Sequence, residues 1–308
     1  ISWTSMENAF FGCGRLVLNA TDVPDLTLVT NTSGMFQVGS NFVDNGDMMN
    51  SWDVSTVTDM NRMFRLTANF NEDISSWDVS SVTNMALMFV ASTRFNSDIS
   101  GWDVSSVTNM FQMLLSTTFF NQNLGSWSMS QVTNVDQMLR STGLDINNYD
   151  ATLIGWSQQT LQSGLLFNSA GNRYSSAGQE ARDIITGTFL WDIQDDEFVP
   201  TPFNTTWETT LDGERIIIPG DAAESYNYTV DWGDGSAAET ITVSDATHIY
   251  ATAGTYTVSI TGIFPRILMN GTADSRTKIR SIEEWGSVSW LSMASAYDGA
   301  SNLVINAM

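Results

Sequence analysis

The stretch Trp77-Asp78-Val79-Ser80-Ser81-Val82-Thr83-Asn84-Met85 decides the fold of this chain, because close copies of it recur at a fixed interval. The copies begin at Trp52, Trp102 and Trp127, so that, with Trp77 included, each tryptophan follows the previous one by 25 residues. A constant period of roughly 20–30 residues is typical of architectures in which each repeat stacks on its neighbours, because one repeat cannot bury its apolar face alone.

The apolar positions inside one repeat indicate what kind of coil it forms. Ile74, Trp77, Val79 and Val82 fit the spacing of a leucine-rich-repeat strand, with Trp and Val in place of Leu. Side chains alternate along a strand, so Trp77 and Val79 are expected to point inward and Asp78 outward. Met85, Met88 and Phe89 then follow at three- and four-residue intervals. This spacing favours a short helix or turn on the side of the coil opposite the strand.

The repeats therefore predict an α/β solenoid of leucine-rich-repeat type, with short parallel strands and short helices or turns. Its structural core is expected to be a buried column of aromatic side chains from successive coils. The members of that column are Trp52, Trp77, Trp102 and Trp127.

Three segments with different patterns follow one another along the chain. Residues 1–198 carry the repeats and two helical stretches, and are interpreted as a repeat solenoid with a C-terminal cap. Residues 199–272 change to short alternating strands separated by Gly, Asp and Pro, which predicts an all-β sandwich. Residues 273–308 return to coil spacing and are interpreted as the first coils of the next tandem solenoid.

The last residues of the chain read like the first ones. Trp290-Leu291-Ser292-Met293 matches Trp3-Thr4-Ser5-Met6, and Leu303-Val304-Ile305-Asn306-Ala307 matches Leu16-Val17-Leu18-Asn19-Ala20 at the same offset of 287 residues. We expect the chain to be one unit of that length followed by the start of another. Its expected partners are other copies of the same unit, in tandem or head to tail, and a heterologous repeat that does not close makes a fibre.

Composition excludes several partners and activities. The chain has 34 acidic and 12 basic residues and a net charge of −22, so nucleic acid and anionic membranes are poor partners. No run reaches the roughly 18 apolar residues of a membrane span, so no membrane insertion is expected. The sequence has one histidine, His248, and one cysteine, Cys13. These are too few for the usual zinc sites, and they leave few residues from which to build a hydrolase triad. We therefore expect a protein that is not an enzyme, with no catalytic residues, no metal site and no cofactor.

The candidate ligand-binding residues form a column on the outer face of the coils. Asp53, Asp78 and Asp103 occupy the same position in successive repeats, and Ser128 ends the column. Carboxylates about 5 Å apart repel each other by roughly 1 kcal/mol in water. The face is therefore either a solvated surface or a site for cations, with Ca²⁺ the possible cofactor, or for hydroxyl-rich ligands. On the repulsion argument, Asp78→Ala is expected to be neutral or stabilising.

The Trp-Asp-Val-Ser-Ser-Val-Thr-Asn-Met repeats resemble those of BspA-like bacterial surface proteins, a 25-residue repeat also known from mycoplasma lipoproteins, over residues 1–195 and 279–308. Residues 203–264 resemble a PKD domain, a small Ig-like sandwich. That resemblance gives a structural role to the turn Asp231, Trp232, Gly233, Asp234 and Gly235, in which Asp-Gly supplies the freedom of a tight hairpin.

These resemblances imply a secreted, extracellular protein on a cell surface. The expected function is that of a non-enzymatic repeat protein, a segment of a tandem-repeat fibre or filament or of an adhesin, that mediates attachment to glycans or to host or other cell surfaces. The alternative is a glycan- or calcium-dependent ligand-binding module of a secreted protein.

Overall fold

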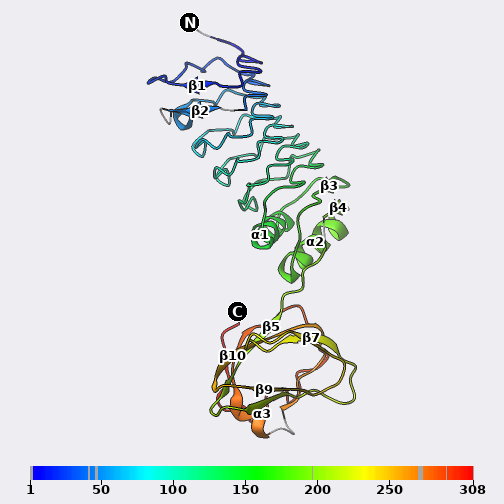
Figure 1. Cartoon of the computed structure of the whole chain (residues 1–308). Coiled ribbons are helices and arrows are strands. Elements are labelled where there is room, and N and C mark those ends of the chain that lie inside the picture. The colour runs from blue at the N-terminus through cyan, green and yellow to red at the C-terminus, as the bar shows by residue number, and fades with distance from the viewer. Residues whose placement is uncertain are drawn as a thin grey trace. The chain divides into compact units, whose positions relative to one another are not determined.

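A computed structural model gives the structure of the chain and describes residues 3–40, 42–45, 48–195, 197–269, 273–288 and 290–307 (Figure 1). The chain divides into two compact units, Ile1–Val199 and Pro200–Met308. Each unit has its own hydrophobic core.

In the first unit the repeats form coils that stack one on the next (Figure 1). Each coil donates backbone N–H groups to carbonyl oxygens of the following coil, as from Arg62 to Ala86 at 3.0 Å and from Phe64 to Met88 at 2.9 Å. Successive coils also meet in single parallel bridges at Asn31, Asp59, Asn84, Asn109 and Asn134. The only regular elements in the early coils that the structure describes are β1 (Val17–Leu18), β2 (Val43–Asp44) and the 3-10 helix η1 (Met49–Ser51).

Aromatic side chains fill the centre of the coils in parallel columns. Phe64 stacks on Phe89 with ring centroids 5.5 Å apart, and Trp77 stacks on Trp102 at 6.4 Å, both with nearly parallel ring planes. The Trp77 indole N–H also donates to the Met49 carbonyl of the preceding coil at 2.7 Å. The same side chain therefore packs the core and fixes the register between coils, because a buried indole N–H needs a partner.

The expected α/β solenoid of leucine-rich-repeat type is wrong. Only 11% of the chain is helical, and the one large sheet is a mixed sheet of six strands in the second unit. In residues 52–145 the structure has no helix and no strand beyond isolated bridges.

Local turns explain why the expected strands and helices are missing. The N–H groups of Trp77 and Val82 donate to the carbonyls of Ile74 and Val79 three residues back, so they are not available to a strand ladder. Where a short helix was expected, Leu87 and Ala91 have positive φ angles of 63° and 56°. Left-handed residues interrupt an α-helix, and the N–H groups of Leu87, Phe89 and Ala91 bond the next coil instead.

Two helices and a small sheet close the first unit. They are α1 (Ile146–Ser157), β3 (Leu166–Asn168), α2 (Ser176–Thr188) and β4 (Asp192–Gln194), with β3 and β4 paired in parallel. Asp145 caps α1 by accepting the Asn148 N–H, as expected of an Asp at a helix N-cap. Trp156 of α1 donates its indole N–H to the Leu124 carbonyl at 2.9 Å, so α1 continues the tryptophan contacts of the coils.

The second unit contains a six-stranded sheet with the strand order β12-β11-β5-β10-β7-β8. A separate two-stranded sheet, β6–β9, packs into the same hydrophobic core. Its elements are β5 (Phe203–Thr209), β6 (Glu214–Ile218), β7 (Asn227–Asp231), β8 (Glu239–Ile241), β9 (Ala246–Tyr250), β10 (Gly254–Ile263), α3 (Ala273–Lys278), β11 (Ile279–Glu284) and β12 (Val304–Ile305). Burial alternates along β5, so one side of the sheet covers the core.

The expected all-β sandwich also needs correction. β11 and β12 pair in parallel while the other strands of the large sheet are antiparallel, so this sheet is mixed. Both strands come from residues 273–308, whose apolar spacing indicated coils rather than a sheet. Ile279 and Ile282 of β11 are fully buried. Their apolar spacing therefore reflects packing into the core of this unit.

Candidate functional site: the exposed face of the coils

Three of the predicted ligand-binding residues lie exposed at the same position of successive coils. Asp53 and Asp78 each accept a hydrogen bond of 2.6 Å from the hydroxyl of the serine two residues later, and Asp103 accepts one of 3.0 Å from the Ser105 backbone N–H. Ser128, which ends the column, is half-buried, and its hydroxyl lies 3.3 Å from that of Ser130. The carboxylates therefore stabilise their own turns while keeping their outer oxygens in solvent.

These hydrogen bonds favour the charged form of the carboxylates. The Ser55 hydroxyl, followed by the Ser55 N–H, holds the pKa of the Asp53 carboxyl below its ordinary value. The Ser105 hydroxyl and N–H do the same to the pKa of Asp103. Hydrogen bonds to a carboxylate stabilise its ionised state, so this face is anionic near neutral pH.

A second set of acidic turns, five residues before the first set in each coil, was not singled out from the sequence. Asp73 accepts the Ser75 N–H at 3.0 Å, and Asp98 accepts the Ser100 N–H and hydroxyl at 3.0 and 2.7 Å. The signal was the repeated Asp-x-Ser spacing, which is typical of a side chain that caps a turn two residues later.

Exposed threonines add a column of hydroxyl groups to the coils. Thr83 donates its hydroxyl to the Thr58 carbonyl and Thr108 donates to the Thr83 carbonyl, both at 3.2 Å. Thr58 and Thr133 make the same contact with their preceding coils at 3.1 Å. Because these hydroxyl protons are used internally, the oxygens face solvent as acceptors.

The four tryptophans named as structural are buried, and the last three make the same cross-coil contact. Trp102 donates to the Ile74 carbonyl at 3.1 Å and Trp127 to the Ile99 carbonyl at 3.0 Å. The repeat that builds the core thereby also holds the aspartates and threonines in register on the outside.

The structural turn of the second unit is held by its own aspartates. Asp231 accepts the Gly233 N–H at 2.9 Å, and Gly233 has a positive φ of 75° with no room for a Cβ next to the Thr257 carbonyl. Trp232 is fully buried and stacks on His248 at 4.9 Å.

His248 of β9 forms a hydrogen bond with this turn. His248 Nε2 lies 2.8 Å from Asp234, whose other oxygen accepts the Ser236 N–H at 3.0 Å. Ser236, followed by His248, holds the pKa of Asp234 well below its ordinary value. Gly235 completes the turn with a φ of 85°.

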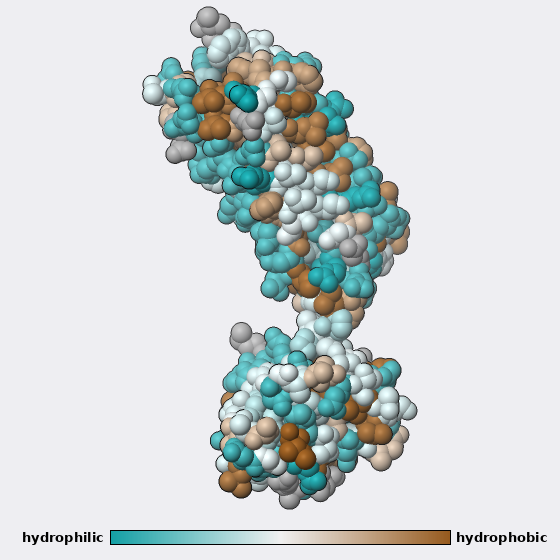
Figure 2. Space-filling model, in the orientation of Figure 1, coloured by the Kyte–Doolittle hydropathy of each residue, from teal (hydrophilic) through white to brown (hydrophobic). Residues whose placement is uncertain are grey.

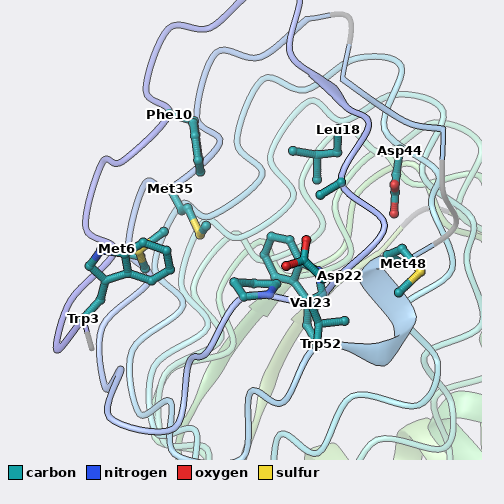
Figure 3. A pocket seen from close by; sticks show the side chains of 12 residues that line it. Trp3, Met6, Phe10, Leu18, Asp22, Val23, Met35, Asp44, Met48 and Trp52 are labelled. Atoms are coloured by element: carbon teal, nitrogen blue, oxygen red, sulfur yellow. The ribbon is translucent and has the colours of Figure 1, made fainter. Parts of the chain in front are cut away.

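An apolar pocket of about 280 Å³ lies in the first coils (Figure 3). Trp3, Met6 and Phe10 line it on one side, and Met35 and Trp52 contribute from the following coils. Its two acidic lining residues, Asp22 and Asp44, were not singled out from the sequence. Cys13 is exposed.

The described residues offer little else for chemistry. Among them, no group of three or more His, Cys, Asp and Glu side chains could hold a metal ion. In the same part of the chain, no helix combines the length and apolar character needed to cross a bilayer.

Stacked coils around columns of Trp and Phe define a protein built from one short repeated unit. A comparison with known families gives the particular family: the one described as "Mycoplasma protein of unknown function, DUF285" matches residues 4–99, 40–151 and 76–174. These matches together span more than half of the chain, and the chain belongs to this family. The resemblance to mycoplasma repeats is thereby confirmed. No curated protein and no solved structure matches the chain.

Proposed function

We propose that this chain is a non-enzymatic, extracellular repeat protein of a cell surface, part of a tandem-repeat fibre or adhesin, that mediates attachment to a surface. The observation that carries the proposal is the exposed polar face of the coils, on which carboxylates and hydroxyl oxygens repeat at fixed positions. Membership in a mycoplasma family supports a surface-type protein. The closer likeness to BspA-like adhesins, and of the second unit to a PKD domain, is part of this proposal.

A periodic polymer is the partner that such a face fits best. The functional groups recur once per coil, so a polysaccharide with regularly spaced hydroxyl groups could contact several coils at once. Linked weak contacts raise the overall affinity without any single strong site. The net charge of −22 disfavours nucleic acid and anionic lipid as partners.

Calcium-dependent binding is the second candidate. It is favoured by the absence, among the described residues, of any ion pair to Asp53, Asp78 or Asp103, whose charges are thus free to meet a cation. In that case a bound Ca²⁺ would bridge the face to sugar hydroxyls.

Binding of the full chain to arrayed bacterial and host glycans tests both candidates. The triple variant Asp53→Asn/Asp78→Asn/Asp103→Asn keeps the turn acceptors and removes the charges, and Asp73→Asn/Asp98→Asn is its matched control on the neighbouring column. We expect binding that the triple variant loses and the control keeps. A calcium chelator abolishes this binding only if the binding depends on calcium. Absence of binding to any glycan or cell surface would contradict the attachment function.

A further inference from the structure

The basic residues of the regular coils, residues 52–145, all fall in one stretch of each coil. The equivalent stretches follow one another by 25 residues and are residues 61–69, 86–94, 111–119 and 136–144. Their basic residues are Arg62, Arg65, Arg94 and Arg140. The half-buried Asp136 is the one acidic residue of these stretches, whereas the exposed aspartates described above lie elsewhere in each coil. We call the exposed side of the four stretches the arginine wall.

The arginines of this wall have no carboxylate partner among the described residues. Their one side-chain contact in that part of the chain runs from Arg140 Nη1 to the Gln137 amide oxygen at 3.4 Å. Elsewhere in the chain, basic side chains lie within 3.1 Å of a carboxylate, as those of Arg182, Arg266 and Arg280 do. Acidic residues outnumber basic ones 34 to 12, so the arginines of the wall are unpaired because of where the coils place the carboxylates.

An exposed aromatic ring lies next to the arginine of the neighbouring coil. The Arg94 N–H donates to the Ala68 carbonyl and the Phe119 N–H donates to the Thr93 carbonyl, both at 3.1 Å. Arg94 and Phe119 therefore occupy the same position in successive coils, with backbones about 4.8 Å apart if the coils keep the spacing of hydrogen-bonded strands. The Phe119 side chain is 66% exposed, so its ring is open to a ligand that contacts Arg94.

Apolar side chains separate the charges along the wall. Arg65 and Arg140 share a coil position three coils apart, which corresponds to about 15 Å at the same spacing. The half-buried Leu87 and Leu115 lie in the coils between them. On the face of the first unit that Figure 2 shows, apolar residues are likewise set among hydrophilic ones over most of the coils. A ligand that fits the wall must therefore alternate charged and uncharged parts.

We propose that the arginine wall binds a polysaccharide whose carboxylate or sulfate groups are spaced along the chain by neutral sugar rings. A guanidinium group matches the oxygens of such anions with paired N–H donors. The C–H groups of a sugar ring carry partial positive charge, and the face of the Phe119 ring is negative, so the two attract. This inference rests on the proposed function in taking a surface polysaccharide as the ligand, and it assigns to it a charged class and a second surface of the coils.

A polymer with densely spaced charges fits the wall less well. Duplex DNA carries one negative charge per roughly 1.7 Å of its axis. Most of those charges would meet no arginine and would be repelled by a chain of net charge −22. Neutral rings between the anionic groups reduce this repulsion and cover the apolar side chains between the arginines.

Calorimetric titration of the full chain with polygalacturonate and with dextran sulfate tests the proposal. Neutral dextran supplies the rings without charge, and polyglutamate supplies carboxylates without rings. We expect binding to at least one of the two anionic polysaccharides, weaker binding to polyglutamate and none to dextran. Which of the two binds shows whether the wall takes carboxylate or sulfate.

Two substitutions with matched controls locate the binding surface. Arg94→Gln should weaken binding about fivefold, as expected for the loss of one exposed charge pair, and Phe119→Ser should weaken it as well. Arg215→Gln and Leu211→Ser make comparable changes at exposed residues of the second unit and should leave binding unchanged. All four side chains are exposed, so the variants should fold like wild type.

The variant Asp53→Asn/Asp78→Asn/Asp103→Asn separates this inference from the proposed function. It loses the glycans held by the aspartates, but it should bind the anionic polysaccharide at least as tightly as wild type, because it removes repulsive charges. Absence of binding to both anionic polysaccharides would overturn the inference and leave binding through the aspartates standing. Equal losses in variants and controls, or polyglutamate that binds as tightly as the polysaccharides, would overturn it too.

Discussion

At the scale of single residues, each aspartate of the outer face stabilises a turn and also exposes a charged oxygen. The Asp78 carboxylate accepts the Ser80 hydroxyl at 2.6 Å and the Ser80 N–H at 3.1 Å, and its remaining oxygen is left for solvent or a ligand. The sequence indicated the charge of Asp78 but not its hydrogen bonds to the turn. The expectation that Asp78→Ala is neutral or stabilising is therefore replaced by a destabilising one. Loss of both hydrogen bonds outweighs the relief of screened repulsion between exposed charges.

We expect Asp78→Ala to lower the free energy of unfolding by about 1 kcal/mol, the usual net value of such hydrogen bonds. Asp78→Asn keeps an oxygen acceptor at the same place and should stay close to wild type. Urea unfolding of both variants measures the difference. If charge repulsion dominated instead, Asn and Ala would have the same effect, and neither would destabilise.

At the scale of elements, an ion pair joins the end of α3 to the start of β6. Glu214 lies 3.1 Å from the Lys278 ammonium, and its other oxygen accepts the Thr210 N–H at 2.6 Å. The Thr210 N–H, followed by Lys278, lowers the pKa of Glu214 from 4.5 to about 2. The fold thus favours the ionised carboxylate, and the connection between β5 and β6 depends on that charge.

This contact predicts a pH dependence with a definite sign. Because the folded pKa is lower than the unfolded one, the stabilisation is fully present above 4.5 and is lost as the pH falls towards about 2. Glu214→Gln should therefore be less stable than wild type at about pH 6 and equal to it at about pH 2 in urea titrations. A stability difference that stays constant over this range would contradict the assignment.

At the scale of the whole molecule, charge opposes the joining of copies. Each chain carries a net charge of −22, so two copies in the proposed fibre repel each other. Sodium chloride screens this repulsion over a Debye length of about 8 Å at physiological ionic strength. The proposed fibre should therefore lengthen as sodium chloride is added, which light scattering measures.

Calcium chloride at matched ionic strength separates screening from binding. A larger effect of calcium, lost in Asp53→Asn/Asp78→Asn/Asp103→Asn, would show that the anionic face takes up the cation. Fibres that shorten as salt is added would show that ionic attraction between copies outweighs the repulsion of their net charges.

The sequence by itself determined the repeat, the buried columns and the match between the chain's two ends. A fixed period with Trp77 and Phe89 at constant positions leaves these side chains no stable place but a shared core, because each coil alone cannot bury them. The positions of the exposed aspartates followed from the same period. At the turn Asp231–Gly235, the Asp-Gly pair correctly indicated a flexible glycine, since Gly235 has a positive φ, but not a tight hairpin, because residues 232–238 join β7 to β8.

Only the tertiary structure decided what the backbone does between those positions. The choice between a strand at Trp77 and a turn depends on whether its N–H finds a partner three residues back or in a neighbouring coil, and side-chain periodicity does not distinguish them. The same holds for β11, whose apolar spacing fits a coil but whose burial belongs to a sheet.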